Sequence, residues 1–323
     1  MWAYDLRFPS SWDHMHVHST MCQARRVRVL TQPSFFGGAD ELRRAFTDRV
    51  GPDRAVRNER FIWDYWHIPR QYTYLRTVAL NAIAPSLLGR FTEALQAWGL
   101  ANLGTDRVTH PWLSYYVEGC HQALHSDVAQ GMWSYVYSLT PWEDRAFTGG
   151  ETLLASPLLL DYWSTFDPTR STESGELVER IPALYDQLTV FDSRLPHGVA
   201  VVEGTRDPVK ARVALHGWFH DPVPTMRGEL DLEGTASVVE GLRAAGRRER
   251  ERYGPILGTS TWRLHIEPDG SVSEVVAVVD NLVPGGPGAG DPTDVVEAER
   301  SLLADAVFER RDGPSELILP LEG

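Results

Sequence analysis

The residues best suited to chemistry are His125 and Asp127, which end the segment YYVEGCHQALHSD at residues 115–127. Residues two positions apart in an extended strand point to the same side, so both side chains can reach one point. An imidazole and a carboxylate are ligands that bind divalent metal ions. The same spacing also ends ordinary polar strands, so a metal site requires a third ligand.

The third candidate ligand is His197, at the start of a predicted strand in LPHGVAVVEG, residues 195–204. Antiparallel strands of one β-sandwich could bring it beside His125 and Asp127. Two histidines and one carboxylate leave one side of an octahedral metal ion open, an arrangement diagnostic of non-haem Fe(II) oxygenases. We therefore interpret these three side chains as a candidate iron site.

Arg212 begins a further predicted strand, RVALHGWF. In that strand it shares one face with His216 and Trp218, so it would point into the same interior as Trp218. A buried guanidinium without an anion partner is costly, and its planar fork binds a carboxylate through two parallel hydrogen bonds. If 2-oxoglutarate chelated the metal, its distal carboxylate would be the partner. An outward-facing surface arginine is the alternative.

The composition restricts the classes of function. The chain of 323 residues has a net charge of -13 and a pI near 5.3, so it lacks the basic surface that non-specific nucleic-acid binding requires. Its two cysteines form no disulfide framework and no zinc or redox motif. The sequence shows no secretory leader and no apolar run of about 18 residues. We therefore expect a cytoplasmic protein with neither a nucleic-acid nor a membrane partner.

The order of the predicted elements indicates an α+β fold. Apolar residues recur at helical spacing over 40–50 and 75–99, which predicts amphipathic helices and a helical support over about 38–100. From about 107 to 220, short runs rich in Tyr, Val, Trp and Thr alternate with turn residues, a pattern typical of β-strands. Helices followed by strands favour a sandwich or jelly roll (cupin-like) braced by helices over a parallel sheet.

The C-terminal part is predicted to form a small ββαβ domain over 256–323, after a linker and helix over 223–255. The prediction rests on two alternating runs joined by a Pro-Asp-Gly turn and followed by a helix and a strand. Residues 1–222 would form the larger domain. Within it, the long segment 156–187 is a candidate cover for a binding site, since long loops in compact domains often serve as lids.

Four motifs in this order resemble the prolyl 4-hydroxylase-like family of Fe(II)/2-oxoglutarate-dependent dioxygenases. They are YYVEGCHQALHSD, YVYSLTPWEDRAFTGGETLL, LPHGVAVVEG and RVALHGWF, which lie within about 107–220. The order of the four motifs is far more specific than any one of them. The resemblance implies a double-stranded β-helix (jelly roll) core in which His125, Asp127 and His197 bind iron.

The same resemblance implies a function. An aliphatic C–H bond would be hydroxylated while 2-oxoglutarate is converted to succinate and CO2. Fe(II), 2-oxoglutarate and O2 would be the cofactor and cosubstrates, and the family also admits ascorbate. Arg212 would bind the 2-oxoglutarate carboxylate, and Tyr116 would line the pocket. The substrate would be a prolyl or other residue of a peptide or protein, or a small metabolite.

The chain departs from the family pattern at two positions. Some members place a second tyrosine, which binds the distal carboxylate, where this chain has Ser138, and Tyr137 would face the other way. Arg206 lies at the spacing from the distal histidine that is common in the family, whereas Arg212 lies further along. Arg212 is the preferred anchor because Trp218 follows it at the expected distance, and Arg206 stays open as the alternative.

Aromatic and arginine side chains crowd residues 58–77. A groove for the substrate is one interpretation of this segment, and a loop that packs on the core is the other. The expected substrate contacts are Trp66, Arg70 and Tyr72, with Trp63 and Tyr65 beside them. Further along the chain, residues 256–322 faintly resemble the TonB C-terminal-like fold, which would suit docking or dimerisation.

Two rival functions belong to other classes of protein. His14, His16 and His18 share one face of any strand they form and resemble the opening signature of metal-dependent phosphoesterases. Such a hydrolase needs further ligands on alternating β/α elements, which the sequence does not predict. The other rival is a non-catalytic jelly-roll binding module. The intact His125, Asp127, His197 and Arg212 argue against it.

Overall fold

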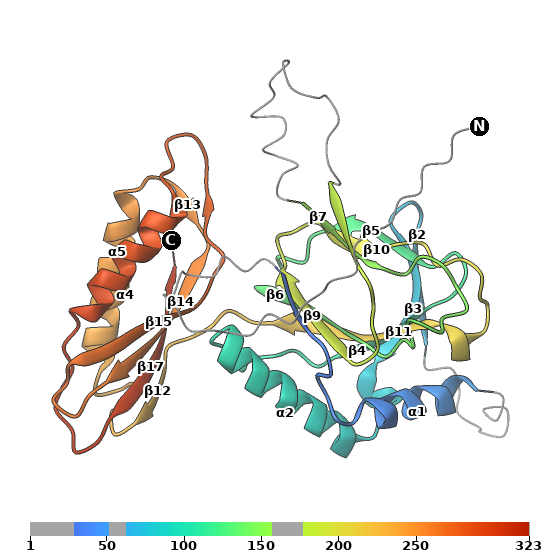
Figure 1. Cartoon of the computed structure of the whole chain (residues 1–323), viewed down its shortest axis with the longest axis horizontal. Coiled ribbons are helices and arrows are strands. Elements are labelled where there is room, and N and C mark those ends of the chain that lie inside the picture. Colours follow the sequence, from blue (N-terminus) through green and yellow to red (C-terminus); the bar gives the residue numbers. More distant parts are fainter. Residues whose placement is uncertain (1–28, 52–62, 157–176, 323) are drawn as a thin grey trace, which may run out of the picture.

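The structure is a computed structural model that describes residues 29–51, 63–156 and 177–322 (Figure 1). The histidines of the rival hydrolase site, at positions 14, 16 and 18, lie outside the described residues. So does most of the predicted cover, residues 157–176. The part of the chain that the structure describes contains no helix that is long and apolar enough to cross a membrane.

Strands β1 to β11 form one curled antiparallel sheet, a half-barrel of the jelly-roll type, as predicted (Figure 1). Its strand order is β1-β9-β6-β11-β4-β3-β5-β10-β7-β8, and β2 pairs with β3. Non-consecutive neighbours bring the motifs together although they are far apart in the sequence. The strands are β1 (Val29–Gln32), β2 (Asp64–Ile68), β3 (Tyr72–Val78), β4 (Trp112–Tyr116), β5 (His121–His125), β6 (Trp133–Ser138), β7 (Thr152–Ala155), β8 (Val178–Ile181), β9 (Gln187–Asp192), β10 (His197–Val199) and β11 (Arg212–Phe219).

The alternation of side chains gives the sheet two different faces. One face packs against helices α1 (Ala39–Val50) and α2 (Pro85–Asn102), which lie beneath the sheet in Figure 1. Its core includes Phe46 and Phe91 from the helices and Leu113, Tyr137 and Val213 from the strands. Burial of these large apolar side chains contributes most of the stability of this layer. The polar, chemically active side chains therefore lie on the opposite face.

The predicted helix over 75–99 is wrong in its first part. Residues Tyr72–Val78 form strand β3, a 3₁₀ turn follows at Ala79–Asn81, and α2 begins only at Pro85. Apolar spacing alone does not separate a short strand from a helix, and pairing of β3 with β2 on one edge and β4 on the other decides in favour of the strand. Pro85 suits the first helical turn, where its missing N–H needs no partner. The support over 38–100 is therefore partly a β-hairpin.

A second strand also interrupts a predicted loop. Val178–Ile181 form β8, which pairs antiparallel with β7. The segment 156–187 was predicted to be one long cover, and its C-terminal end is instead part of the sheet. Residue Ile181 is buried there against Leu154 and Phe191, so apolar contact stabilises this edge strand.

A second, four-stranded sheet follows in the order β12-β17-β14-β15. Helices α4 (Ala236–Glu251) and α5 (Pro292–Ala304) lie side by side over it (Figure 1). The predicted hairpin, the final helix and the final strand are all present. In the predicted linker and helix over 223–255, the helix is present as α4, and the linker part supplies strand β12 to this same sheet. The strands are β12 (Thr225–Gly228), β14 (Thr259–Ile266), β15 (Val272–Asp280) and β17 (Ser315–Glu322), with a separate pair β13 (Ile256–Leu257) and β16 (Val283–Pro284).

Candidate metal centre

Three predicted ligands meet at the end of β5. His125 ends this strand, Asp127 follows it, and His197 begins β10, where it is paired directly opposite His125. The Nε2 atom of His125 lies 3.6 Å from Asp127 Oδ1, and that of His197 lies 3.2 Å from Asp127 Oδ2. One ligand atom from each residue lies within 4.8 Å of the others. Among the described residues, this is the group of side chains that could hold a metal ion.

The hydrogen bonds of the two histidines orient their rings. Nδ1 of His125 lies 2.9 Å from the carbonyl oxygen of Ala123, and Nδ1 of His197 lies 2.9 Å from that of Leu195. A carbonyl oxygen only accepts, so each Nδ1 donates a hydrogen bond. The Nε2 atom of each ring is thereby turned toward the carboxylate of Asp127. Metal-ligating histidines are oriented in this way, by a carbonyl oxygen that binds the other ring nitrogen.

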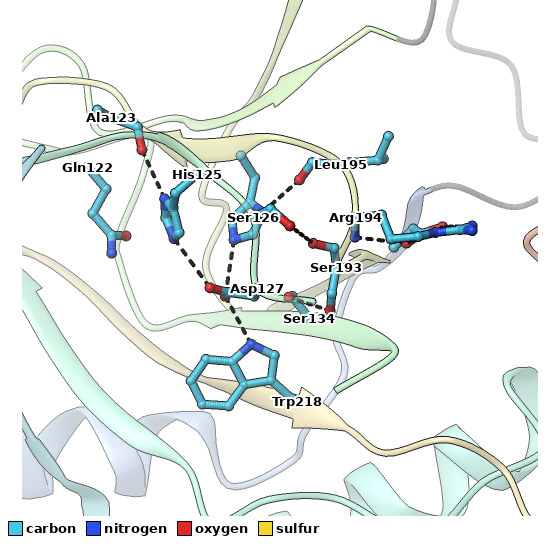
Figure 2. A network of polar contacts seen from close by, with 12 residues as sticks. Gln122, Ala123, His125, Ser126, Asp127, Ser134, Ser193, Arg194, Leu195 and Trp218 are labelled. Carbon is cyan, nitrogen blue, oxygen red and sulfur yellow. Dashed lines mark hydrogen bonds and ion pairs between the residues drawn. The ribbon is translucent and has the colours of Figure 1, made fainter. Parts of the chain in front are cut away.

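Asp127 is held through its side chain and its backbone. Trp218 Nε1 donates a hydrogen bond of 2.9 Å to Oδ2 of the carboxylate (Figure 2). The backbone N–H of Asp127 donates to the carbonyl oxygen of Ser193 at 3.0 Å. Burial raises the pKa of Asp127, but the contacts with His197 and Trp218 outweigh it and hold the pKa below its usual value. The carboxylate is therefore ionised and oriented before any ligand arrives.

These ligands lie in a cavity of about 370 Å³ on the polar face of the sheet. This volume falls in the range of small-molecule sites, roughly 300 to 1,000 Å³. Two arginines, Arg76 and Arg212, line the cavity, and Asp127 is the one carboxylate that the described residues contribute to its wall. The cavity is therefore a cationic recess in an acidic protein.

Arg212 is 1% exposed and lies at the inner end of this cavity. Its Nε donates to the carbonyl oxygen of Gly150 at 2.6 Å, and one Nη donates to Thr152 Oγ1 at 3.3 Å. Within the described ranges it forms no ion pair, and Glu151 pairs with Arg180 at 3.6 Å. Burial lowers the pKa of Arg212, but arginine stays charged. A charged group with donors to spare therefore faces the cavity.

The Gly-Gly-Glu motif shapes the wall next to Arg212. Gly150 has a φ of 78°, a left-handed conformation that glycine adopts without strain. A Cβ atom at this position would come within 3.3 Å of the Cδ atom of Arg212. The glycine therefore lets its own carbonyl oxygen approach the guanidinium.

Tyr116 covers the guanidinium of Arg212, whose central carbon lies 4.7 Å from the ring centre. The ring of Tyr74 stacks on Tyr116 with an interplanar angle of 10°, and Tyr116 Oη donates to Gln122 Oε1 at 3.0 Å. Burial raises the pKa of Tyr116 well above its usual value. The phenol therefore stays protonated. Tyr116 lines the cavity, as the resemblance implied.

The two departures from the family pattern have different outcomes. Ser138 lies on the inner face of β6, but its Oγ donates to the carbonyl oxygen of Ala183 at 2.7 Å and it does not line the cavity. Tyr137 points to the other side, as expected, and bonds Asp186. The side chain of Arg206 is 84% exposed and pairs with Glu118 at 3.0 Å, so it lies outside the cavity.

Of the five expected substrate contacts, the structure brings two to the cavity, Trp66 and Tyr72. Trp63 is instead 4% exposed in the core against Tyr115, which favours the packing alternative for that residue. Tyr65 stacks on the exposed His67 on the outer side of β2. Arg70 is an exposed turn residue between β2 and β3 with a φ of 66°. These two side chains do not reach the cavity.

Several cavity residues were not predicted. Arg76 and Trp112 line it from β3 and β4, and Thr152 binds Arg212 from β7. His216, which was expected to share a face with Arg212, also lines the cavity and shares a hydrogen bond of 2.7 Å with Ser114 Oγ. Burial, together with the nearby Arg76, lowers the pKa of His216 to about 3, so this ring is neutral near pH 7. Strand alternation beyond the quoted motifs could have found Ser114 and Trp112, since they share a face with Tyr116.

Comparison with known proteins gives one family and a set of distant structures. The sequence model of the 2OG-Fe(II) oxygenase superfamily matches residues 111–220. No match was found among curated proteins.

Solved structures with a similar fold include a prolyl hydroxylase from Trichoplax adhaerens in complex with a hypoxia-inducible-factor peptide, at 16% identity and a TM-score of 0.40, covering 60% of this chain and 84% of that one. A prolyl-4-hydroxylase from Pseudomonas putida has 15% identity and a TM-score of 0.37, covering 59% and 91%. HygX from Streptomyces hygroscopicus, with nickel, 2-oxoglutarate and hygromycin B bound, has 13% identity and a TM-score of 0.37, covering 59% and 82%.

Proposed function

We propose that this chain, whose residues 111–220 are a 2OG-Fe(II) oxygenase domain, holds Fe(II) at His125, Asp127 and His197 and uses it to hydroxylate an aliphatic C–H bond. Enzymes of this superfamily use Fe(II), 2-oxoglutarate and O2. The observation that carries the proposal is the convergence of two imidazole Nε2 atoms on the carboxylate of Asp127 inside a cavity. Two imidazoles and a carboxylate are the donor set of non-haem Fe(II) oxygenases.

Arg212 is the proposed anchor for the distal carboxylate of 2-oxoglutarate. Its guanidinium is buried, oriented by Gly150 and Thr152, and free of a carboxylate partner among the described residues. A guanidinium binds a carboxylate through paired N–H donors, and burial strengthens such a bond. Arg206 does not fit this role because it is exposed and already paired with Glu118.

A metal held by His125, Asp127 and His197, together with 2-oxoglutarate and O2, would supply the oxidation of the substrate, and 2-oxoglutarate would be converted to succinate and CO2. The chain supplies orientation and a restricted environment. Trp218 holds the carboxylate of Asp127, and the two backbone carbonyl groups hold the imidazole rings. Trp66 and Tyr72 line the cavity with aromatic surface, and an apolar wall of this kind offers water few hydrogen-bond partners.

The substrate in this proposal is a prolyl or other residue of a peptide or protein, or a small metabolite. The wall formed by Trp66, Tyr72 and Tyr74 offers flat apolar contact beside the metal ligands. Such a wall suits an aliphatic ring or chain, because burial of apolar surface is favourable without directional bonds.

An anaerobic titration tests the proposal. Fe(II) and 2-oxoglutarate are added to the metal-free full-length protein, and the weak visible charge-transfer band of the chelated cosubstrate is recorded. The band should appear in the wild type and in Asp144→Ala, which changes an exposed aspartate, and should be absent in Asp127→Ala. A wild type without the band, or a band that persists in Asp127→Ala, would sink the proposal.

A further inference from the structure

Arg76 is a second arginine in the cavity, on the middle strand of the β2-β3-β4 region. The central carbon of its guanidinium lies 3.2 Å from the ring centre of Trp66 and 4.1 Å from that of Trp112. Because β2 and β4 pair with opposite edges of β3, the two rings approach from different sides. Cation–π contacts of this kind hold a guanidinium in place and leave its N–H groups free at the edge.

The polar edge of Arg76 lacks a full set of partners. Its Nε is buried and has no hydrogen-bond acceptor, and no carboxylate within the described ranges forms an ion pair with this side chain. Arg76 lies near Tyr74 and lowers the pKa of that phenol, although burial raises it more. An unsatisfied buried donor is costly, so its presence in a folded protein calls for a partner outside the chain.

The charges of the occupied cavity also point to an anion. This step rests on the proposed function. The carboxylate of Asp127 and the two carboxylates of 2-oxoglutarate offset the charge of Arg212 and the two charges of Fe(II). His216 adds no charge near pH 7 because its pKa is lowered to about 3. The positive charge of Arg76 is left over, on the side of the cavity that the aromatic residues Trp66 and Tyr72 cover.

We propose that Arg76 binds a carboxylate of the oxidised substrate, so that the substrate of this enzyme is a carboxylic acid. The guanidinium lies over the rings of two indoles, so its in-plane N–H donors are the groups left for a ligand. Those donors match a planar carboxylate in geometry and in charge. The acid group is held at the Trp66–Trp112 end of the cavity, and the apolar part of the substrate extends over Tyr72 and Tyr74 toward the metal ligands.

Matched acids and amides test this proposal because they differ in charge and little in shape. The probes are N-acetyl-L-proline with N-acetyl-L-prolinamide, phenylacetate with phenylacetamide, and acetyl-Ala-Ala-Pro with a free or an amidated C-terminus. Each is titrated anaerobically into full-length protein loaded with Fe(II) and 2-oxoglutarate. Tryptophan fluorescence and the shift of the charge-transfer band report binding. The peptide pair distinguishes a peptide C-terminus from a small acid as the source of the carboxylate.

At least one acid should bind tenfold or more tightly than its amide in the wild type. Arg76→Met should abolish this preference, Arg76→Lys should restore part of it, and Arg90→Met, which changes an exposed arginine paired with Glu41, should leave it intact. The Arg76 variants should keep the affinity for 2-oxoglutarate.

Two results would overturn the inference: the absence of any acid preference in the wild type, and a preference that survives in Arg76→Met. Loss of 2-oxoglutarate binding in Arg76→Met would also overturn it, because Arg76 would then be the cosubstrate anchor. The charge-transfer band separates these results from failure of the proposed function. If the band forms and the acids are not preferred over their amides, the proposed role of Arg76 is wrong and the proposed function still stands.

Discussion

Each of the two large sheets encloses a buried arginine, and the two arginines differ in their partners. Arg250, between the helices and the second sheet, is 3% exposed. Its guanidinium bonds Glu299 at 2.6 Å, Ser260 at 2.8 Å and the carbonyl oxygens of Gly258 and Leu321. Arg212, in the jelly roll, is equally buried but bonds only neutral oxygens, and part of its edge faces a cavity.

The contrast separates a structural charge from a binding charge. The network of Arg250 closes within the protein, since Glu299 also bonds Ser260 and Trp262, so it joins α4, α5 and the sheet. The network of Arg212 is complete only when an anion enters. A buried charge therefore indicates a ligand site when its partners are incomplete and a cavity adjoins it, and burial alone does not indicate one.

The largest expected effect is on the stability of the second sheet. Arg250→Met should lower the free energy of unfolding by about 3 to 5 kcal/mol, because it leaves the carboxylate of Glu299 buried and uncompensated. Arg212→Met should cost less than half as much, since no buried carboxylate loses its ion pair. Urea unfolding followed by circular dichroism measures both. Equal losses of unfolding free energy in Arg250→Met and Arg212→Met would show that the two arginines do not differ in their structural role.

The next effect concerns the affinity for 2-oxoglutarate. Arg212→Gln should weaken binding to the metal-loaded protein about 30-fold or more, since loss of one partner of a buried charge pair costs about 2 kcal/mol or more. Arg206→Gln serves as the control, because that side chain is exposed and paired with Glu118. Anaerobic calorimetry measures both constants. A larger loss of 2-oxoglutarate affinity in Arg206→Gln would show that Arg206, and not Arg212, binds the distal carboxylate.

Metal affinity should respond more weakly to Trp218. Trp218→Phe removes the hydrogen bond to Asp127 Oδ2 and should lower the affinity for Fe(II) about tenfold, at the lower end of what loss of a partner that orients a ligand costs. Trp142→Phe changes a buried tryptophan that makes no contact with the ligands and is the control. Competition with a chromophoric chelator gives the affinities. Unchanged affinity in Trp218→Phe would show that Asp127 is held by its backbone alone.

The smallest effect near neutral pH concerns two histidines, one from each sheet. His216 is neutral in the cavity, with its pKa lowered to about 3 by burial and by Arg76, whereas His265 is exposed on the second sheet near Glu274. Below about pH 6.5 the unfolded chain gains a proton that folded His216 does not bind, so stability falls as the pH falls from that value toward 3.

The loss from His216 should be roughly 1 kcal/mol between pH 7.5 and 6. His216→Gln should flatten the decline in the free energy of unfolding over this interval, and His265→Gln should not remove it. Urea unfolding across the pH series measures the decline. An identical decline in wild type and His216→Gln would show that other groups cause it.

The sequence by itself determined the residues of the candidate metal centre and most of the strands around it. His125 and Asp127 follow from the two-residue repeat of a strand, and the His197 and Arg212 strands carry their own alternating patterns. These are local properties, since the side on which a strand residue points depends only on its neighbours in the chain. The run of short strands followed from composition and turn residues, and the jelly-roll core followed from the resemblance of the four motifs to a family.

The tertiary structure decided two kinds of question that the local sequence left open. One is whether a segment forms a strand or a helix, and the other is whether a side chain is buried or exposed. Tyr72–Val78 became a strand because β2 and β4 pair with it, and this pairing turned Arg76 into the cavity. The exposure of Arg206 and the burial of Trp63 were settled in the same way, by packing between distant segments. Pairing and packing depend on residues far apart in the sequence, and local spacing carries no record of them.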